Sequence, residues 1–310
     1  SMMEFVVDES SVGKVTGKVA NLLSNTLPLS SESSAPEEAV FEVVTNPSNG
    51  AKMLTLTAAA GATVDSRTNA VMSIMKHLKA QNIVTGWRDE MLTLSSGFYD
   101  EPLLFVERAA APFLGMLQYG VHINGVVKSS SSLKMWMARR SATKSKYPAM
   151  LDQMVAGGQP AGISLLDNVV KECIEEAGIP RELTLKGIQA VGAISYEEFQ
   201  PFDTYDAHAK DATMMDTNVI DGVFTRAVLF NYDLELPDDF EPKAIDGEVD
   251  GFFTWGLEEL FESMAKNYHD PIKPNCYICI VDFLVRKGYV SPEVAGYLDV
   301  LRELRSGSCG

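Results

Sequence analysis

The chain has 310 residues, enough for two domains, and 46% of them are hydrophobic, so a sizeable core can form. Its formal net charge of −16 at pH 7 argues against nucleic acid or an anionic membrane surface as the main partner. No apolar run reaches the length of a membrane span. We therefore expect a folded protein, with a monomer and a homodimer both left open.

Cysteine usage indicates the compartment. The four cysteines, at positions 173, 276, 279 and 309, fit a reducing environment better than a disulfide framework. The first residues lack the basic and apolar regions of a secretory signal peptide. We expect a cytoplasmic protein, and prior removal of a plastid or mitochondrial transit peptide is consistent with the same features.

The first part of the chain mixes strand and helix patterns. Residues 1–28 have only a weak pattern, with a short strand predicted at 4–7, whereas apolar residues recur at helical spacing over Ser66–Ala80. The other elements predicted here are strands at 41–44 and 53–57, a strand that follows 86–90 and ends at 94, a strand at 103–106 and a helix at 107–117. We expect residues 1–114 to form a smaller α+β accessory domain.

A second domain is expected over residues 115–310. It begins with a predicted hairpin of strands 119–128 and 133–139 around a serine run. Three further strands are predicted, at 190–196, at 222–233 and after the turn 246–252, where the strand ends at 255. Three helices are predicted, at 257–266, at 275–287 with Asn275 as its N-cap, and a last one that begins at 291. Intermixed strands and helices indicate an α/β (α+β) fold, with a mixed sheet covered by helices on both faces.

Residues 197–216 form an acidic stretch between two of these strands. They include six carboxylates but only one lysine, Lys210, so self-repulsion disfavours compact packing. Long loops of this kind are commonly lids. We predict a mobile flap at the mouth of a site, with a solvated insertion as the alternative.

The strongest pattern is the stretch 157–179, in which a glycine turn leads into an acidic helix. Ser164 is a predicted N-cap, and Gly178 is placed to end the helix. Glu172, Glu175 and Glu176 fall at i, i+3 and i+4, so a helix places them on one face. Clustered carboxylates near the negative end of a helix dipole indicate a counter-cation, and hard oxygen ligands suit Mg²⁺ or Mn²⁺.

This stretch resembles the Nudix box, G-x5-E-x7-R-E-U-x-E-E-x-G-U with U apolar. The positions that match are Gly157, Glu172, Cys173, Glu175, Glu176, Gly178 and Ile179. Two positions depart from the pattern, with Ile163 in place of a glutamate and Lys171 in place of an arginine. An ammonium keeps the charge of arginine but lacks the fork that holds a carboxylate through two hydrogen bonds.

Stretches outside the box are similar to one Nudix branch, the thiamine-pyrophosphokinase-related hydrolases, which carry an extra N-terminal domain. The matching pieces include 86–90, 107–124, 136–152, 246–252 and 273–288. The resemblance implies a Nudix α/β/α sandwich that uses Mg²⁺ or Mn²⁺. It also implies hydrolysis of thiamine diphosphate, or of its oxo and oxy damage analogues, to the monophosphate and phosphate.

Hydrolysis of a phosphoanhydride requires neutralised phosphates, an oriented water and a base. We predict Glu172 and Glu176 as metal ligands, with Glu175 as a third ligand or as the partner of Lys171. The carbonyl of Ala156 or of Gly157 is a further predicted ligand. Glu248, in the turn DGEV, is the predicted ligand or general base from outside the box.

Basic residues precede the box. The stretch 109–151 contains no Asp or Glu. Within it Arg139, Arg140 and Lys144 are predicted phosphate contacts, although successive strand residues point to opposite faces. Tyr196, just before the acidic stretch, is the predicted contact for the organic group, with other aromatic residues as alternatives.

Three alternatives remain open from the sequence. Arg140–Pro148 is similar to a segment of isopentenyl-diphosphate isomerases, but 150–158 lacks the cysteine that their chemistry uses. A nucleoside-diphosphate compound such as ADP-ribose is another possible substrate. Ile163 and Lys171 favour a binding or regulatory module with weakened catalysis.

Overall fold

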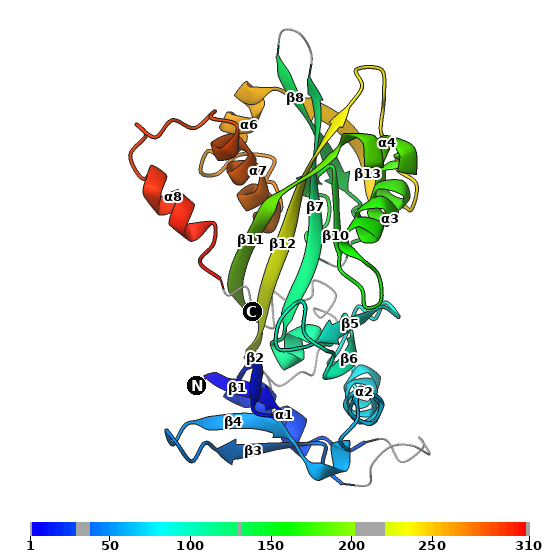
Figure 1. The fold of residues 1–310 in the computed structure, drawn as a ribbon, viewed down its shortest axis with the longest axis vertical. Coiled ribbons are helices and arrows are strands. Elements are labelled where there is room, and N and C mark those ends of the chain that lie inside the picture. Colours follow the sequence, from blue (N-terminus) through cyan, green and yellow to red (C-terminus); the bar gives the residue numbers. More distant parts are fainter. Residues whose placement is uncertain (1, 29–37, 129–131, 145, 202–220, 308–310) are drawn as a thin grey trace. The chain divides into compact units, whose positions relative to one another are not determined.

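The computed structural model describes residues 2–28, 38–128, 132–144, 146–201 and 221–307 (Figure 1). The chain divides into two compact units. One contains the described residues of Ser1–Gln118 and Glu197–Ala227, and the other contains Tyr119–Tyr196 and Val228–Gly307. The boundary predicted between residues 114 and 115 stays a prediction. Most of the predicted flap lies outside the described residues.

The first unit contains a four-stranded sheet in the order β2-β1-β4-β3. Its strands are β1 (Met2–Val7), β2 (Ser10–Thr16), β3 (Phe41–Thr45) and β4 (Lys52–Leu56), and β1 pairs with β4 in parallel. Helices α1 (Gly17–Asn25) and α2 (Val64–Ala80) bury apolar residues in the same core as the strands. Fully buried Phe5, Phe41 and Leu54 mark the centre of that core.

Two predictions for the first unit were incomplete or wrong. The elements β1, β2 and α1 span residues 2–25; the strand predicted at 4–7 lies within β1, whereas β2 and α1 fall where the sequence showed only a weak pattern. The helix predicted at 107–117 is wrong, because Glu107 ends β6 (Leu104–Glu107), which pairs with β5 (Met91–Leu94). Only a short 3₁₀ turn, η2 (Ala111–Leu114), follows; Pro112 lacks a backbone N–H, and Gly115 turns the chain with a φ of 55°.

The second unit is built on a sheet in the order β11-β12-β7-β8-β13, with β10 added to β7 and β9 added to β8. The predicted hairpin is present as β7 (Leu117–Lys128) and β8 (Leu133–Arg140). The other strands are β9 (Leu151–Gln153), β10 (Val155–Gly158), β11 (Ile188–Pro201), β12 (Gly222–Leu236) and β13 (Val249–Trp255).

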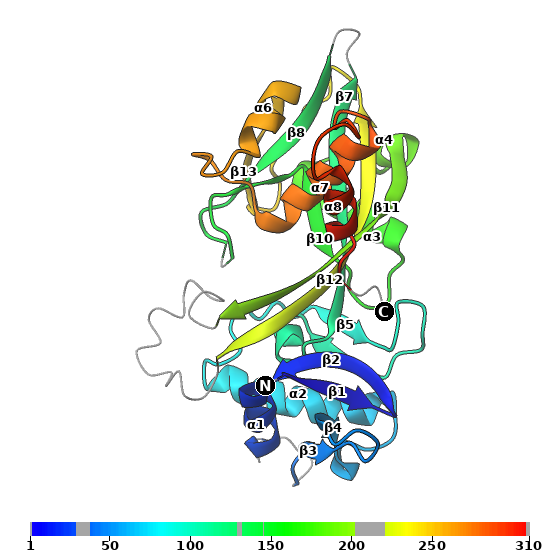
Figure 2. The same ribbon diagram turned by 90° about the vertical axis from the view of Figure 1, so that its left-hand side faces the viewer.

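Helices cover both faces of this sheet. Figures 1 and 2 show α3 (Leu165–Ala177) and α4 (Arg181–Gly187) on one side, and α6 (Leu257–Ser263) and α7 (Pro274–Arg286) on the other. On β7, Val121 and Ile123 share a core with α3, whereas Val126 shares a core with α7. Side chains of a strand alternate between its faces, so one strand supplies both cores. The predicted α/β class, with helices on both faces of the sheet, is confirmed.

The C-terminal helices begin at other residues than predicted. α7 starts at Pro274 with Lys273 as its N-cap, rather than with Asn275 as the cap. The last helix, α8 (Tyr297–Glu303), starts after Gly296 at a φ of 87°, not at Ser291. Within the described part of the chain, no helix combines the length and apolar character needed to cross a membrane.

Candidate functional site

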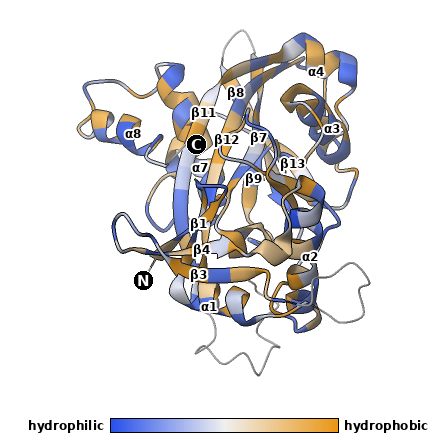
Figure 3. Cartoon of the chain, turned by 60° about the horizontal axis from the view of Figure 1, so that its bottom comes forward, coloured by the Kyte–Doolittle hydropathy of each residue, from blue (hydrophilic) through white to orange (hydrophobic). Residues whose placement is uncertain are grey.

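Helix α3 is fixed at both ends as its sequence predicts. The Ser164 side chain accepts a hydrogen bond from the backbone N–H of Asp167 (3.1 Å) and donates to the Asp167 carboxylate (2.7 Å). Gly178 ends the helix at a φ of 63°. Figure 3 shows both hydrophobic and hydrophilic residues on this helix. Val169 and Cys173 are buried in the core, which leaves Glu172 and Glu176 beside strand β10.

Strand β10 leaves room for one of these glutamates. A Cβ added to Gly157 would lie 2.2 Å from Cδ and 2.5 Å from Oε1 of Glu172. No side chain fits there unless the carboxylate moves. The glycine that begins the predicted motif is therefore the surface on which the Glu172 carboxyl group rests.

Glu176 has a strongly perturbed carboxyl group. It is buried, and its carboxyl group accepts a hydrogen bond of 3.0 Å from the backbone N–H of Ala156. Burial, together with the negative charges of Glu172 and Asp152, raises the pKa of Glu176 to about 8. This side chain is consequently a neutral acid at pH 7 in the metal-free protein.

Lys171, which replaces the arginine of the motif, lies between two carboxylates of its own helix. Its Nζ is 3.0 Å from Glu172 and 3.0 Å from Glu175. Burial opposes the shift, but hydrogen bonds to Glu175 and Glu172 raise the pKa of Lys171. The other departure, Ile163, is exposed before the helix begins.

The opposite side of the site comes from two segments that the sheet brings together. β13 pairs with β8, so the turn at Glu248 and the loop after Arg140 meet at one end of the ladder. The backbone N–H of Ser141 donates to the carbonyl of Glu248 (2.9 Å). The register shifts between Val249 and Gly251, a β-bulge that adds Asp250 to β13.

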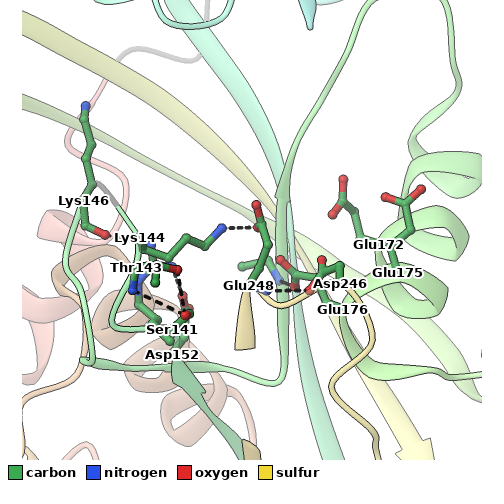
Figure 4. Close-up of polar contacts among 12 residues, drawn as sticks. Ser141, Thr143, Lys144, Lys146, Asp152, Glu172, Glu175, Glu176, Asp246 and Glu248 are labelled. Carbon is green, nitrogen blue, oxygen red and sulfur yellow. Dashed lines mark hydrogen bonds and ion pairs between the residues drawn. The ribbon is translucent and has the colours of Figure 1, made fainter. Parts of the chain in front are cut away.

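Lys144 connects this side to the acidic helix. Its ammonium donates to the Glu248 carboxylate, and Figure 4 shows that carboxylate between Lys144 and the glutamates of α3. Burial lowers the pKa of Lys144, whereas Glu248 and Glu176 oppose that shift. Lys144 therefore lies within electrostatic range of both Glu248 and Glu176.

Arg140 organises the loop that carries Lys144. Its guanidinium donates to the carbonyls of Lys146 and Tyr147 (both 2.9 Å) and to Asp152 (2.6 Å). Asp152 also accepts a hydrogen bond of 2.6 Å from the thiol of Cys276. Burial alone would raise the pKa of Asp152, but the positive charges of Lys273 and Arg140 lower it to about 2.

Arg139 is held elsewhere, in an ion pair with two contacts of 2.6 and 2.5 Å to Asp270. Both arginines thus have carboxylate partners, and their role as phosphate contacts stays a prediction. The partners Asp152 and Asp270 were not foreseen. They lie 12 and 131 residues from the arginines they bind, and no local spacing signals such pairs.

Tyr196 lies on β11, at the edge of the sheet opposite to β13. It is half-buried beside the backbone of Gly307. Its predicted contact with the organic group of a substrate stays a prediction. The residues that the structure brings together are Lys144, Glu172, Glu175, Glu176 and Glu248.

The donor chemistry of this group suits a hard divalent cation, because carboxylate oxygens are the ligands that Mg²⁺ and Mn²⁺ prefer. Gly157 leaves room for the Glu172 carboxyl group beside β10, and the buried Glu176 carboxyl group is held at the same strand by the backbone N–H of Ala156. In the described ranges, however, no three His, Cys, Asp or Glu side chains converge into a ready metal site. Lys171 and Lys144 hold the carboxylates instead.

Comparisons with known proteins place these features in context. Residues 1–118 match a family described as "Domain of unknown function (DUF4743)". Nudix hydrolase 20, chloroplastic, and Nudix hydrolase 24, chloroplastic, both from Arabidopsis thaliana, are each 41% identical over 245 residues, which is 79% of this chain. The chain spans 59% and 61% of the lengths of these two relatives.

A third relative is similar over more of its own length. Uncharacterized protein YJR142W from Saccharomyces cerevisiae is 34% identical over 246 residues, which cover 77% of this chain and 68% of that protein. Together with the motif on β10 and α3, these identities show that the chain belongs to the Nudix hydrolase family.

Proposed function

We propose that the protein hydrolyses the phosphoanhydride bond of a small-molecule diphosphate with the help of Mg²⁺ or Mn²⁺. The observation that carries the proposal is the position of the buried acids Glu172 and Glu176 opposite Lys144 and Glu248. Acidic groups can hold a divalent cation there, and an ammonium beside them can meet an anionic substrate. Family membership supports the same reaction class.

Each residue of the group has a proposed role. Glu172, Glu176 and Glu175, with the carbonyl of Gly157, hold the metal. Bound there, the cation would neutralise phosphate charge and lower the pKa of a coordinated water. Glu248 is a further ligand or the general base, and Lys144 contacts the diphosphate.

The protonation of Glu176 couples metal binding to pH. Since its pKa is about 8 without metal, it holds a proton at pH 7 that must leave before the carboxylate can act as a ligand. Metal loading should therefore release a proton. The backbone N–H of Ala156 keeps the carboxyl group in place in both protonation states.

The proposed substrate is thiamine diphosphate or one of its oxo and oxy analogues, cleaved to the monophosphate and phosphate. The support for this choice is the similarity of stretches outside the box to the thiamine-pyrophosphokinase-related branch. A nucleoside-diphosphate compound such as ADP-ribose is the alternative within the same reaction class.

The test is release of phosphate and monophosphate from a panel of diphosphates with Mg²⁺, Mn²⁺ or a chelator. We expect turnover only with metal, a higher kcat/KM for thiamine-type diphosphates than for ADP-ribose, and loss of turnover in Glu176→Gln. A higher kcat/KM for ADP-ribose would overturn the proposed substrate. Wild-type turnover by Glu176→Gln at limiting metal would remove this residue from the site.

A binding or regulatory module is the second candidate function. Lys171 favours it, since its ammonium, 3.0 Å from both Glu172 and Glu175, pairs with two acids at the place proposed for the metal. Under this alternative the chain binds diphosphates but turns none over. Tight binding without product release across the whole panel would support it over hydrolysis.

We propose that residues 1–114 form an accessory domain and 115–310 the hydrolase domain. The family match over 1–118 supports a separate N-terminal region. The proposed location is the cytoplasm, and two relatives carry the word chloroplastic in their names. Fluorescence microscopy of a C-terminal fusion to the full-length natural protein would decide between cytoplasm and plastid.

A further inference from the structure

Two lysines contact the carboxylates that we assign to the metal, and they differ in how they are attached. Lys171 is on the same helix as its partners Glu172 and Glu175, so it stays beside them. Lys144 lies on a separate loop, 104 residues from Glu248 in the sequence. Lys144 can therefore leave Glu248 through a movement of its own side chain, whereas Lys171 stays beside Glu172 and Glu175.

The surroundings of Lys144 require an anion close by. Its side chain is only 14% exposed, and the positive charge of Arg140 acts on it as well. A charge taken out of water is costly unless it is paired. Glu248 provides that pairing, because its carboxylate accepts a hydrogen bond from the Lys144 ammonium.

The loop that carries Lys144 is anchored independently of its ammonium. Arg140 binds the carbonyls of Lys146 and Tyr147, and the backbone of Ser141 binds that of Glu248. The long side chain can therefore change its rotamer while the backbone on both sides stays in place. A partner other than Glu248 can be reached without refolding the loop.

We propose that Lys144 is an exchangeable counter-ion that couples the binding of metal and diphosphate. Its ammonium neutralises Glu248 in the metal-free protein and transfers to the diphosphate when a divalent cation takes over that carboxylate. This inference rests on the proposed function and adds regulation to the same site. Because such coupling is reciprocal, each ligand raises the affinity for the other through this one side chain.

The exchange predicts an effect that a simple phosphate contact would not produce. Removing Lys144 takes away the ammonium that competes with a cation for the Glu248 carboxylate, so the affinity for metal alone should rise. A charge-assisted hydrogen bond of ordinary strength corresponds to a change of about tenfold. If Lys144 served the phosphate only, the affinity for metal alone would be unchanged.

The experiment is isothermal titration of the full chain with Mn²⁺, with and without methylenediphosphonate as an inert diphosphate. We expect Lys144→Gln to bind Mn²⁺ alone about tenfold more tightly than wild type, and to show about tenfold less enhancement by the diphosphonate. Lys146→Gln is the matched control. It removes the same charge from the same loop, and Figure 4 shows its side chain directed away from Glu248. We expect it to behave as wild type.

A second variant tests the other partner. Glu248→Gln releases Lys144, so methylenediphosphonate without metal should bind about tenfold more tightly, while Mn²⁺ alone binds more weakly. Asp246→Asn removes one charge from the same turn and should give a much smaller gain. Equal Mn²⁺ affinity in wild type and Lys144→Gln would overturn the exchange and leave the proposed function intact. A wild type that binds neither Mn²⁺ nor the diphosphonate would overturn the proposed function itself.

Discussion

Glu176→Gln should stabilise the metal-free protein although it abolishes activity. The folded protein holds the Glu176 proton up to a pKa of about 8, whereas the unfolded chain releases it near 4.5. Folding therefore binds a proton between these values, and stability falls as pH rises through that window. Glutamine has no proton to lose, and its side-chain oxygen can still accept the hydrogen bond from Ala156.

The size of the effect follows from the two pKa values. At roughly 1.4 kcal/mol per pKa unit, an ionisable Glu176 costs the folded state about 4 kcal/mol at pH 8 and less than about 1 kcal/mol at pH 5. Relaxation of the protein around the ionised carboxylate reduces the cost at pH 8. We expect the variant to exceed wild type by about 2 to 4 kcal/mol in free energy of unfolding at pH 8.

Urea unfolding in the presence of a chelator at pH 5 and pH 8 measures this difference. Glu175→Gln is the control, because it removes a half-exposed carboxylate from the same helix face. With added Mn²⁺, wild type should have the higher free energy of unfolding, since the metal stabilises wild type more than Glu176→Gln. Equal destabilisation of Glu176→Gln at both pH values would refute the reasoning, because Glu176 would then be ionised without metal.

Two further changes test the acidic helix. Gly157→Ala places a Cβ 2.2 Å from Cδ of Glu172, so we expect Mn²⁺ affinity in titration calorimetry to fall at least tenfold with little loss of stability. Gly251→Ala, whose Cβ meets nothing within 4 Å, should leave Mn²⁺ binding unchanged; equal effects of the two would contradict the steric argument. Ile163→Glu combined with Lys171→Arg should raise kcat or metal affinity, because a guanidinium fixes carboxylates better than an ammonium. No gain in either measurement would show that these departures are neutral.

Features set by neighbouring residues were predictable from the sequence. The limits of α3 follow from Ser164 and Gly178, and the three glutamates share a face because the helix period requires it. By contrast, α1 is short and begins at Gly17, a residue with poor helix propensity, so tertiary packing of Val19 and Leu23 decides its structure.

The site itself was only partly predictable. Lys144 and Glu248 were each identified from local patterns, but their contact depends on how β8 pairs with β13. The ion pairs of Arg140 with Asp152 and of Arg139 with Asp270 likewise form only because the folded sheet and its loops bring these residues together. Pairing across such distances is set by packing of the whole unit, and no spacing within the sequence encodes it.

The single extra residue in β13 has a consequence for how this site can vary among related chains. Side chains of a strand alternate, so deletion of Asp250 would turn the residues before it to the opposite face and leave Phe252–Trp255 where they are. Glu248 would then point away from Lys144 while the hydrophobic core stayed intact. Length at this one position, more than the identity of the residue, decides whether the sheet delivers an acid to the reaction centre. A relative with the same strands and glutamates but one residue fewer here should fold normally and be inactive.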